Sequence, residues 1–466
     1  MREQRKPRLG LLALMTDGYE PIFPGITARQ ENYARELASQ MSPYAEIRFE
    51  GIGGNRGEIA KIVCRYNQEE LDGILIVLLT YSHGAYLLKA LEENHLPLAM
   101  AVVQPDQEVQ DDWGELELTV NQGIHGAQDN ANAILHSKTA CAFFAGNRME
   151  TPFLEFVEDF AKACYTRSRL KNMRTGVLSR MCGMGDILTD EMEFLRQIGP
   201  EMCHDTIGSV YSLMEQVTKE EIDGQIEYDR SVHEVDPRLT YESHAEAAKM
   251  YLGFRRYLEN QGFDAFTAQF DQFKDDGRFR QLPLYAASNL LADGYGYAAE
   301  GDYMCASMVA AAGALGNLDA NFTEMYTMDF AKKAIIFCHA GEGNWTTAAK
   351  GRKVRLIDRY LGEGGLENPP TYLFTPRPGT ATLTSLASIG GGKYRLVMAK
   401  GEILPKSDLK RCEMPYIFWR PDCGMEACVE QWLRNGGTHH EVINLGDVTR
   451  RWKMLMDMLG CEYVQL

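Results

Sequence analysis

Four places in the sequence put glutamate or histidine beside glycines or other small residues, where a side chain can reach into a pocket. Glu300 precedes Gly-Asp, Glu324 follows Asn-Phe-Thr, His339 precedes Ala-Gly-Glu-Gly-Asn, and a His439-His440 pair follows Gly-Gly-Thr. Two carboxylates and two imidazoles suit a divalent cation of intermediate hardness such as Mn²⁺, with positions left for ligand hydroxyls. These residue types therefore predict a metal centre.

Each of these residues also has an ordinary structural explanation when it is taken alone. Glu300 fits the start of a helix, where a carboxylate interacts favourably with the helix dipole. Glu324 fits a solvated charge near a helix start, and His339 fits a strand-end histidine bonded to a backbone group. The histidine pair follows a predicted helix that a Gly-Gly pair terminates. The residues alone leave these alternatives open.

Composition and charge exclude several classes of function. Of the 466 residues, 45% are hydrophobic and 24% are charged, which is typical of globular proteins, and the length predicts two or three domains. A formal net charge of −17 without a lysine or arginine run argues against nucleic-acid and anionic-membrane partners. Eleven scattered cysteines without a CxxC pair are typical of reduced thiols. We expect a soluble, cytoplasmic protein with a small neutral ligand and no membrane span.

The predicted fold class is α/β. Apolar runs alternate with amphipathic helical patterns through residues 1–169, which predicts a doubly wound, Rossmann-like domain around a parallel sheet. A central α/β domain is expected over residues 170–330, and a β-rich, barrel-like domain over 331–466, where Gly and Pro separate short strands. The expected N-terminal strands are residues 9–15, 45–50, 73–79, 98–103 and 140–145.

Several motifs occur in an order that resembles a known family. The longest covers residues 247–303 and ends in Gly-Tyr-Gly-Tyr-Ala-Ala-Glu-Gly-Asp; residues 322–327 read Phe-Thr-Glu-Met-Tyr-Thr, and 436–440 read Gly-Gly-Thr-His-His. In sequence and in order along the chain, these segments are similar to motifs of the L-arabinose isomerases. The resemblance implies a metal-dependent aldose–ketose isomerase that uses Mn²⁺, or another divalent metal such as Co²⁺ or Mg²⁺.

The resemblance also implies roles for individual residues and for the assembly. Its implied metal ligands are Glu300, Glu324, His339 and His440, and the two glutamates would be the catalytic acid and base. It assigns sugar contacts to Gln122 and His125 in an Asn-Gln-Gly-Ile-His-Gly loop, to His439, and to Phe270, for which a core position is the alternative. The implied N-terminal domain recognises substrate within a homotrimer or homohexamer.

Departures from the family pattern surround the expected sugar pocket. Residues 15–19 replace a Ser-Gln-His-Leu-Tyr type segment, residues 180–186 match loosely, and the segment after His339 differs. An L-arabinose-like sugar is therefore expected, with L-fucose, D-arabinose or a branched pentose as alternatives. The expected reaction passes through a cis-enediol, and a direct hydride shift is its rival. The alternative to an enzyme is a sugar-binding protein without catalytic activity.

Overall fold

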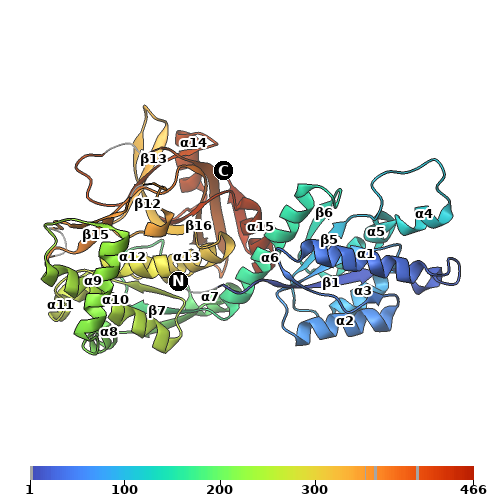
Figure 1. Ribbon diagram of the computed structural model, residues 1–466, viewed down its shortest axis with the longest axis horizontal. Coiled ribbons are helices and arrows are strands. Elements are labelled where there is room, and N and C mark those ends of the chain that lie inside the picture. The colour runs from blue at the N-terminus through green and yellow to red at the C-terminus, as the bar shows by residue number, and fades with distance from the viewer. Residues whose placement is uncertain (1–3, 352, 362–364, 406–408) are drawn as a thin grey trace. The chain divides into compact units, whose positions relative to one another are not determined.

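The computed structural model describes residues 4–351, 353–361, 365–405 and 409–466. The chain forms two compact units, residues 4–168 and residues 169–466, whose elements are drawn in Figure 1. All eleven cysteines lie in the described ranges and are free thiols. Within those ranges, no helix has both the length and the apolarity required to cross a membrane.

The first unit is built on a parallel sheet, as predicted. Its strand order is β2-β1-β4-β5-β6, with β3 also paired to β1. The strands are β1 (Arg8–Leu14), β2 (Glu46–Arg48), β3 (Ile52–Gly53), β4 (Gly73–Leu78), β5 (Leu98–Val102) and β6 (Cys141–Ala145). The helices are α1 (Ile26–Met41), α2 (Arg56–Gln68), α3 (Gly84–Leu91), α4 (Glu115–Val120), α5 (Gly123–Ser137) and α6 (Thr151–Lys171).

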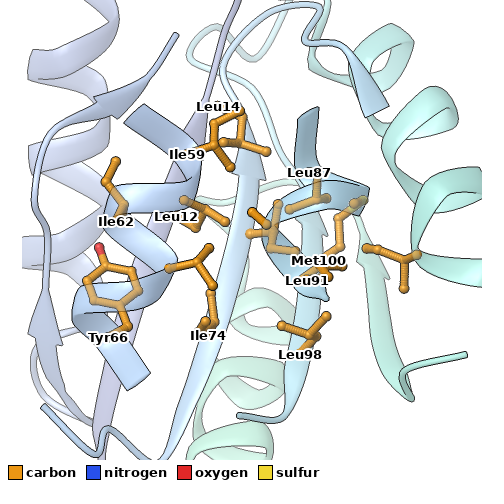
Figure 2. Packing of buried hydrophobic residues seen from close by; sticks show 14 of the residues in the cluster. Leu12, Leu14, Ile59, Ile62, Tyr66, Ile74, Leu87, Leu91, Leu98 and Met100 are labelled. Atoms are coloured by element: carbon orange, nitrogen blue, oxygen red, sulfur yellow. The ribbon is translucent and has the colours of Figure 1, made fainter. Parts of the chain in front are cut away.

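Helices cover both faces of this sheet. On one face, aliphatic side chains of α2 and α3 pack on the strands, with Leu12, Ile59 and Leu87 fully buried (Figure 2). Burying one such side chain contributes roughly 1.5–3 kcal/mol. On the other face, α6 approaches so closely that a Cβ atom on Gly73 would lie 2.5 Å from Sγ of Cys164. The strands are therefore enclosed, which explains their continuous apolar sequences.

In its described residues, the second unit contains a four-stranded parallel sheet, with seven helices in the segments that connect and follow its strands. The strand order is β11-β10-β7-β8, from β7 (Arg174–Leu178), β8 (Glu201–Asp205), β10 (Ala265–Ala268) and β11 (Gly296–Ala299). The helices are α7 (Glu191–Gln197), α8 (Ile207–Met214), α9 (Lys219–Val232), α10 (Tyr241–Gln261), α11 (Asp271–Asp276), α12 (Leu284–Asp293) and α13 (Tyr303–Leu315).

Six further strands of this unit close into a β-barrel. The hydrogen-bonded order is β16-β19-β12-β13-β18-β17, and β17 pairs back to β16, while β20 joins β17 outside the ring. The barrel strands are β12 (Ala320–Asp329), β13 (Ala334–Cys338), β16 (Gly379–Ser388), β17 (Tyr394–Ile403), β18 (Tyr416–Pro421) and β19 (His440–Leu445), and the strand outside the ring is β20 (Glu462–Gln465). Two helices, α14 (Met425–Arg434) and α15 (Thr449–Leu459), and a small sheet of β9 (Glu234–Val235), β14 (Arg355–Asp358) and β15 (Pro370–Leu373) complete the unit.

The barrel includes more of the chain than the sequence predicts. It begins with β12 at Ala320, ahead of residue 331, where we expected the β-rich part to start. Glu324 consequently belongs to the barrel and not to the central α/β segment. Helix α13 is buried along its whole length and contacts β10 and β11 as well as β12 and β19, so it joins the parallel sheet to the barrel.

Candidate metal centre

Antiparallel pairing in the barrel places three of the predicted ligands side by side. Strand β12 lies between β13 and β19, so that Glu324 is opposite Cys338 on one side and opposite His440 on the other. His339 follows Cys338 directly. Glu324 is therefore a strand residue and does not begin a helix, and strand register brings it to both histidines.

Glu300 reaches the same place from the carboxyl end of β11. Its φ is 66° and that of Gly301 is 89°, which is the left-handed region that costs non-glycine residues energy. A Cβ atom on Gly301 would lie 2.3 Å from Cα of Arg180, so glycine is required there. Asp302 then caps α13 by accepting a hydrogen bond from the Cys305 N–H at 2.9 Å. Glu300 thus stands in a strained turn ahead of the helix.

The potential ligand atoms of these residues converge. Nε2 of His440 lies 3.3 Å from Oε2 of Glu300 and 3.3 Å from Oε1 of Glu324. Nε2 of His339 lies 3.7 Å from the same Glu324 oxygen, and Nε2 of His439 lies 3.8 Å from Oε2 of Glu300. One ligand atom each from Glu300, Glu324, His439 and His440 falls within 4.8 Å of all the others. The structure therefore groups three of the predicted ligands, Glu300, Glu324 and His440, with His439, and the fourth, His339, lies beside Glu324.

Two buried atoms in this cluster, Oε2 of Glu300 and Nε2 of His440, have no hydrogen-bond partner within the described part of the chain. Buried polar atoms rarely remain unpaired. Nδ1 of His440 is bonded to Asp302 at 2.9 Å, and Nδ1 of His339 to Glu342 at 2.8 Å. A histidine that donates from Nδ1 to a carboxylate presents the lone pair of Nε2, as metal-binding histidines do. The residues present therefore fit a divalent cation.

The charges of the cluster are strongly coupled. Burial raises the pKa of Glu300, but His439 and His440 more than offset this and hold that pKa at about 2. Burial lowers the pKa of His440, whereas the surrounding carboxylates of Asp302, Glu300 and Glu324 raise it well above its ordinary value. Protons on the histidines thus neutralise the carboxylates, and a cation binding here would have to replace them.

Family comparisons bear directly on this cluster. A family model described as the L-arabinose isomerase central domain matches residues 183–317, and the L-arabinose isomerase C-terminal domain matches residues 319–462. Together the two models span more than half of the chain and include every residue of the cluster. The chain belongs to the L-arabinose isomerase family. This family consists of sugar aldose–ketose isomerases, and the chain shares that class of activity.

Relatives within the family match over nearly the whole chain. The L-arabinose isomerases of Clostridium beijerinckii and Bacillus subtilis are each 26% identical, covering 97% of this chain and 95% of their own. That of Nocardioides sp. is 27% identical over 94% of this chain and 92% of its own. A periplasmic solute-binding protein of Actinobacillus succinogenes with bound D-allose aligns at 11% identity over 67% of this chain and 92% of its own. Its TM-score of 0.18 supports no argument about fold or function.

Two phenylalanines border the histidines of this isomerase-family site. The ring of Phe270 is stacked on His339 with 6.0 Å between centroids, so the residue predicted as a sugar contact lies beside a proposed ligand. Phe322 was not predicted, and its ring lies 4.9 Å from that of His339 and 5.1 Å from that of His440. Because side chains in a strand repeat every two residues, its position two residues before Glu324 was the available signal.

Two carboxylates that hold the histidines were also missed. Asp302 stands two residues after Glu300, and Glu342 three residues after His339. Glu342 is buried and also accepts a hydrogen bond from the Tyr297 hydroxyl at 2.8 Å. Burial raises the pKa of Glu342, but His339 reverses that effect and lowers it. A carboxylate close in sequence to each ligand was the signal, since such groups orient metal histidines.

The remaining predicted residues lie in two places. His439 is at the open side of the cluster, with its side chain 39% exposed. Gln122 and His125 belong to the first unit, where Oε1 of Gln122 lies 3.4 Å from Nδ1 of His125. They start α5 at the carboxyl ends of the strands, since a Cβ atom on Gly123 would lie 2.4 Å from the carbonyl oxygen of Leu78 in β4. That edge of a parallel sheet is where ligands bind in such domains.

Proposed function

We propose that the chain is a cytoplasmic, metal-dependent isomerase that interconverts a small aldose, L-arabinose or a close relative, and its 2-ketose. Glu300, Glu324, His339 and His440 would hold Mn²⁺, or else Co²⁺ or Mg²⁺. The observation that carries this proposal is the pair of buried, unpaired atoms on Glu300 and His440, which lie 3.3 Å apart beside the Glu324 carboxylate. When bound, the cation would supply positive charge that polarises the sugar's carbonyl and hydroxyl oxygens.

Isomerisation through a cis-enediol needs a base that moves a proton between C2 and C1 of the sugar. It also needs a path for a proton between the oxygens on these two carbons. We assign the base to Glu324, which takes the proton from C2 of the aldose and returns it to C1. With a pKa of about 2, Glu300 is ionised at neutral pH, so it starts the cycle as a proton acceptor for the reacting oxygens. General acid–base catalysis of this kind contributes on the order of 10²–10⁴ in rate.

The competing hydride shift moves hydrogen directly between the two carbons. Turnover in D₂O separates the mechanisms, because a proton held on Glu324 exchanges with solvent and a transferred hydride does not. We expect deuterium at C1 of the ketose formed from the aldose, and complete absence of deuterium would replace the enediol mechanism by the hydride shift.

The choice of sugars to test follows from residues near the expected pocket. Near the expected pocket, residues 15–19 and the segment after His339 differ from the family's sequence motifs. These departures favour testing L-fucose, D-arabinose and a branched pentose beside L-arabinose.

A panel assay tests the function itself. Protein stripped of metal and reloaded with Mn²⁺, Co²⁺ or Mg²⁺ is incubated with each aldose, and ketose formation is measured. We expect one or more aldoses to be converted only by the reloaded protein. If no aldose is converted with any metal while calorimetry detects sugar binding, the chain is a sugar-binding protein and the proposal fails.

We further propose that residues 1–169, as a doubly wound, Rossmann-like domain, contribute Gln122 and His125 to the sugar site of a neighbouring subunit. The assembly would then be a homotrimer or homohexamer. His125 is exposed and Gln122 is half-buried, at the edge formed by the carboxyl ends of the strands. Native mass spectrometry should show a three-fold assembly, and a monomer that isomerises sugar at full rate would refute this arrangement.

A further inference from the structure

The segment between β7 and α7 is anchored on both sides of Asp186. Near its start, the backbone N–H of Met181 donates to the carbonyl oxygen of Glu300 at 2.8 Å. Ile187, the next residue after Asp186, is fully buried. At the end, Asp190 caps α7. Asp186 therefore has a defined place beside the metal centre, although its segment has no regular secondary structure.

A single oxygen of Asp186 holds His439 at two points. Oδ2 accepts a hydrogen bond from the backbone N–H of His439 at 2.9 Å and lies 2.7 Å from Nδ1 of the same residue. A carboxylate only accepts, so Nδ1 carries the proton in this contact. The opposite ring nitrogen, Nε2, is then directed toward Glu300, 3.8 Å from its Oε2, on the half-exposed side of the cluster.

We propose that Asp186 is the positioning residue of His439. By fixing both the backbone and the ring, it presents Nε2 to a hydroxyl of the sugar. The inference rests on the proposed function, because the sugar is what His439 would contact. An imidazole without this partner is free to rotate, and a misplacement of about 1 Å costs roughly 100-fold in rate.

Two substitutions separate positioning from charge. Because both contacts use the same oxygen, the single carbonyl oxygen of Asp186→Asn can accept both hydrogen bonds, whereas Asp186→Ala can accept neither. We expect Asp186→Ala to lower kcat/KM for the best aldose by roughly 100-fold, and Asp186→Asn to stay within several-fold of wild type. Mn²⁺ content should be unchanged in both variants.

Asp190→Ala is the matched control, because it removes the helix cap of the same segment. It should lower thermal stability and leave kcat/KM near wild type. Equal losses in Asp186→Ala and Asp186→Asn would overturn the proposal by showing that charge is what matters. So would near-normal turnover by Asp186→Ala, or a loss of Mn²⁺ or stability beyond that of Asp190→Ala. Wild-type enzyme that converts no aldose would instead be a failure of the proposed function.

Discussion

At the residue scale, the site depends on which nitrogen of each histidine carries a proton. His440 and His339 are each bonded through Nδ1 to a carboxylate, Asp302 and Glu342, at 2.9 Å and 2.8 Å. These contacts leave Nε2 of both rings facing the cluster. The carboxylates therefore orient both imidazole rings for cation binding in the metal-free protein.

Asp302→Asn should disable His440 without disturbing the fold. The side-chain oxygen that caps α13 is Oδ1, and the one that holds His440 is Oδ2. Asparagine can keep the cap with its oxygen and turn its NH₂ group to the ring, which moves the imidazole proton to Nε2. We expect Mn²⁺ affinity to fall about 10–100-fold by calorimetry, with an unchanged melting temperature. Wild-type affinity would show that the tautomer of His440 is unimportant.

Glu324→Gln should remove the base while keeping the volume of the side chain. Its amide oxygen can still coordinate a cation weakly, but it cannot accept the C2 proton. We expect normal folding, weaker Mn²⁺ binding and a loss of isomerisation of about 10²–10⁴, measured with saturating Mn²⁺. Glu227→Gln, at an exposed position on α9, is the control and should stay within a few fold. Near-normal turnover by Glu324→Gln would assign the base to another residue.

At the scale of elements, strands with an uninterrupted pattern could be predicted and β12 could not. The N-terminal strands were expected almost at their observed positions, because apolar runs bounded by Gly and Pro mark them. In β12 a register shift between Met325 and Thr327 breaks the two-residue alternation. Glu324, one residue before that shift, therefore looked like a helix-start residue.

The site itself was predictable only in part. Residue types and motif sequences selected Glu300, Glu324, His339 and His440; the structure groups Glu300, Glu324 and His440 with His439 and places His339 beside Glu324. Their convergence depends on cross-strand register and on the left-handed backbone of Glu300, and neither leaves a local pattern in the sequence. The sequence shows Asp302 and Glu342 close to the proposed ligands. Their role in orienting the histidines follows only from the structure, in which each carboxylate contacts Nδ1 of a histidine.

Gly301→Ala tests how the turn after β11 holds Glu300. The substitution would put a Cβ atom 2.3 Å from Cα of Arg180 at a φ of 89°. We expect the free energy of unfolding to fall by at least about 1–3 kcal/mol in denaturant titration, with weaker Mn²⁺ binding. Gly224→Ala, inside α9 with no atom within 4 Å of the added Cβ, should instead stabilise by about 0.4–1 kcal/mol. Equal effects would mean that the turn is not strained.

At the scale of the whole molecule, the cluster ties the end of a parallel sheet to three barrel strands. A cation bound there would stabilise the folded chain by mass action, by about 2.7 kcal/mol at 100 times Kd. It competes with protons, because the hydrogen bond to Asp186 and the nearby Glu300 carboxylate raise the pKa of His439 to about 9, and that of His440 is raised as well.

This competition predicts opposite pH dependences for the metal-free and metal-loaded protein. A histidine pKa raised on folding contributes stability below its unfolded value of about 6.5, and this stability is lost as pH rises through about 9 for His439. The stabilisation by Mn²⁺ should therefore grow between pH 6 and pH 9, as the protons to be displaced become fewer. Melting temperatures with and without Mn²⁺ across this range measure it, and a constant difference would contradict it. His440→Ala is the control, in which Mn²⁺ should have little effect at any pH.

The most direct test of the central claim is an anomalous diffraction measurement at the manganese edge on crystals grown with Mn²⁺. The account predicts one strong peak in the second unit, within about 2.0–2.3 Å of side-chain atoms of Glu300, Glu324, His339 and His440. A peak bound by other residues, or none at this cluster under conditions in which the enzyme turns over sugar, would contradict it.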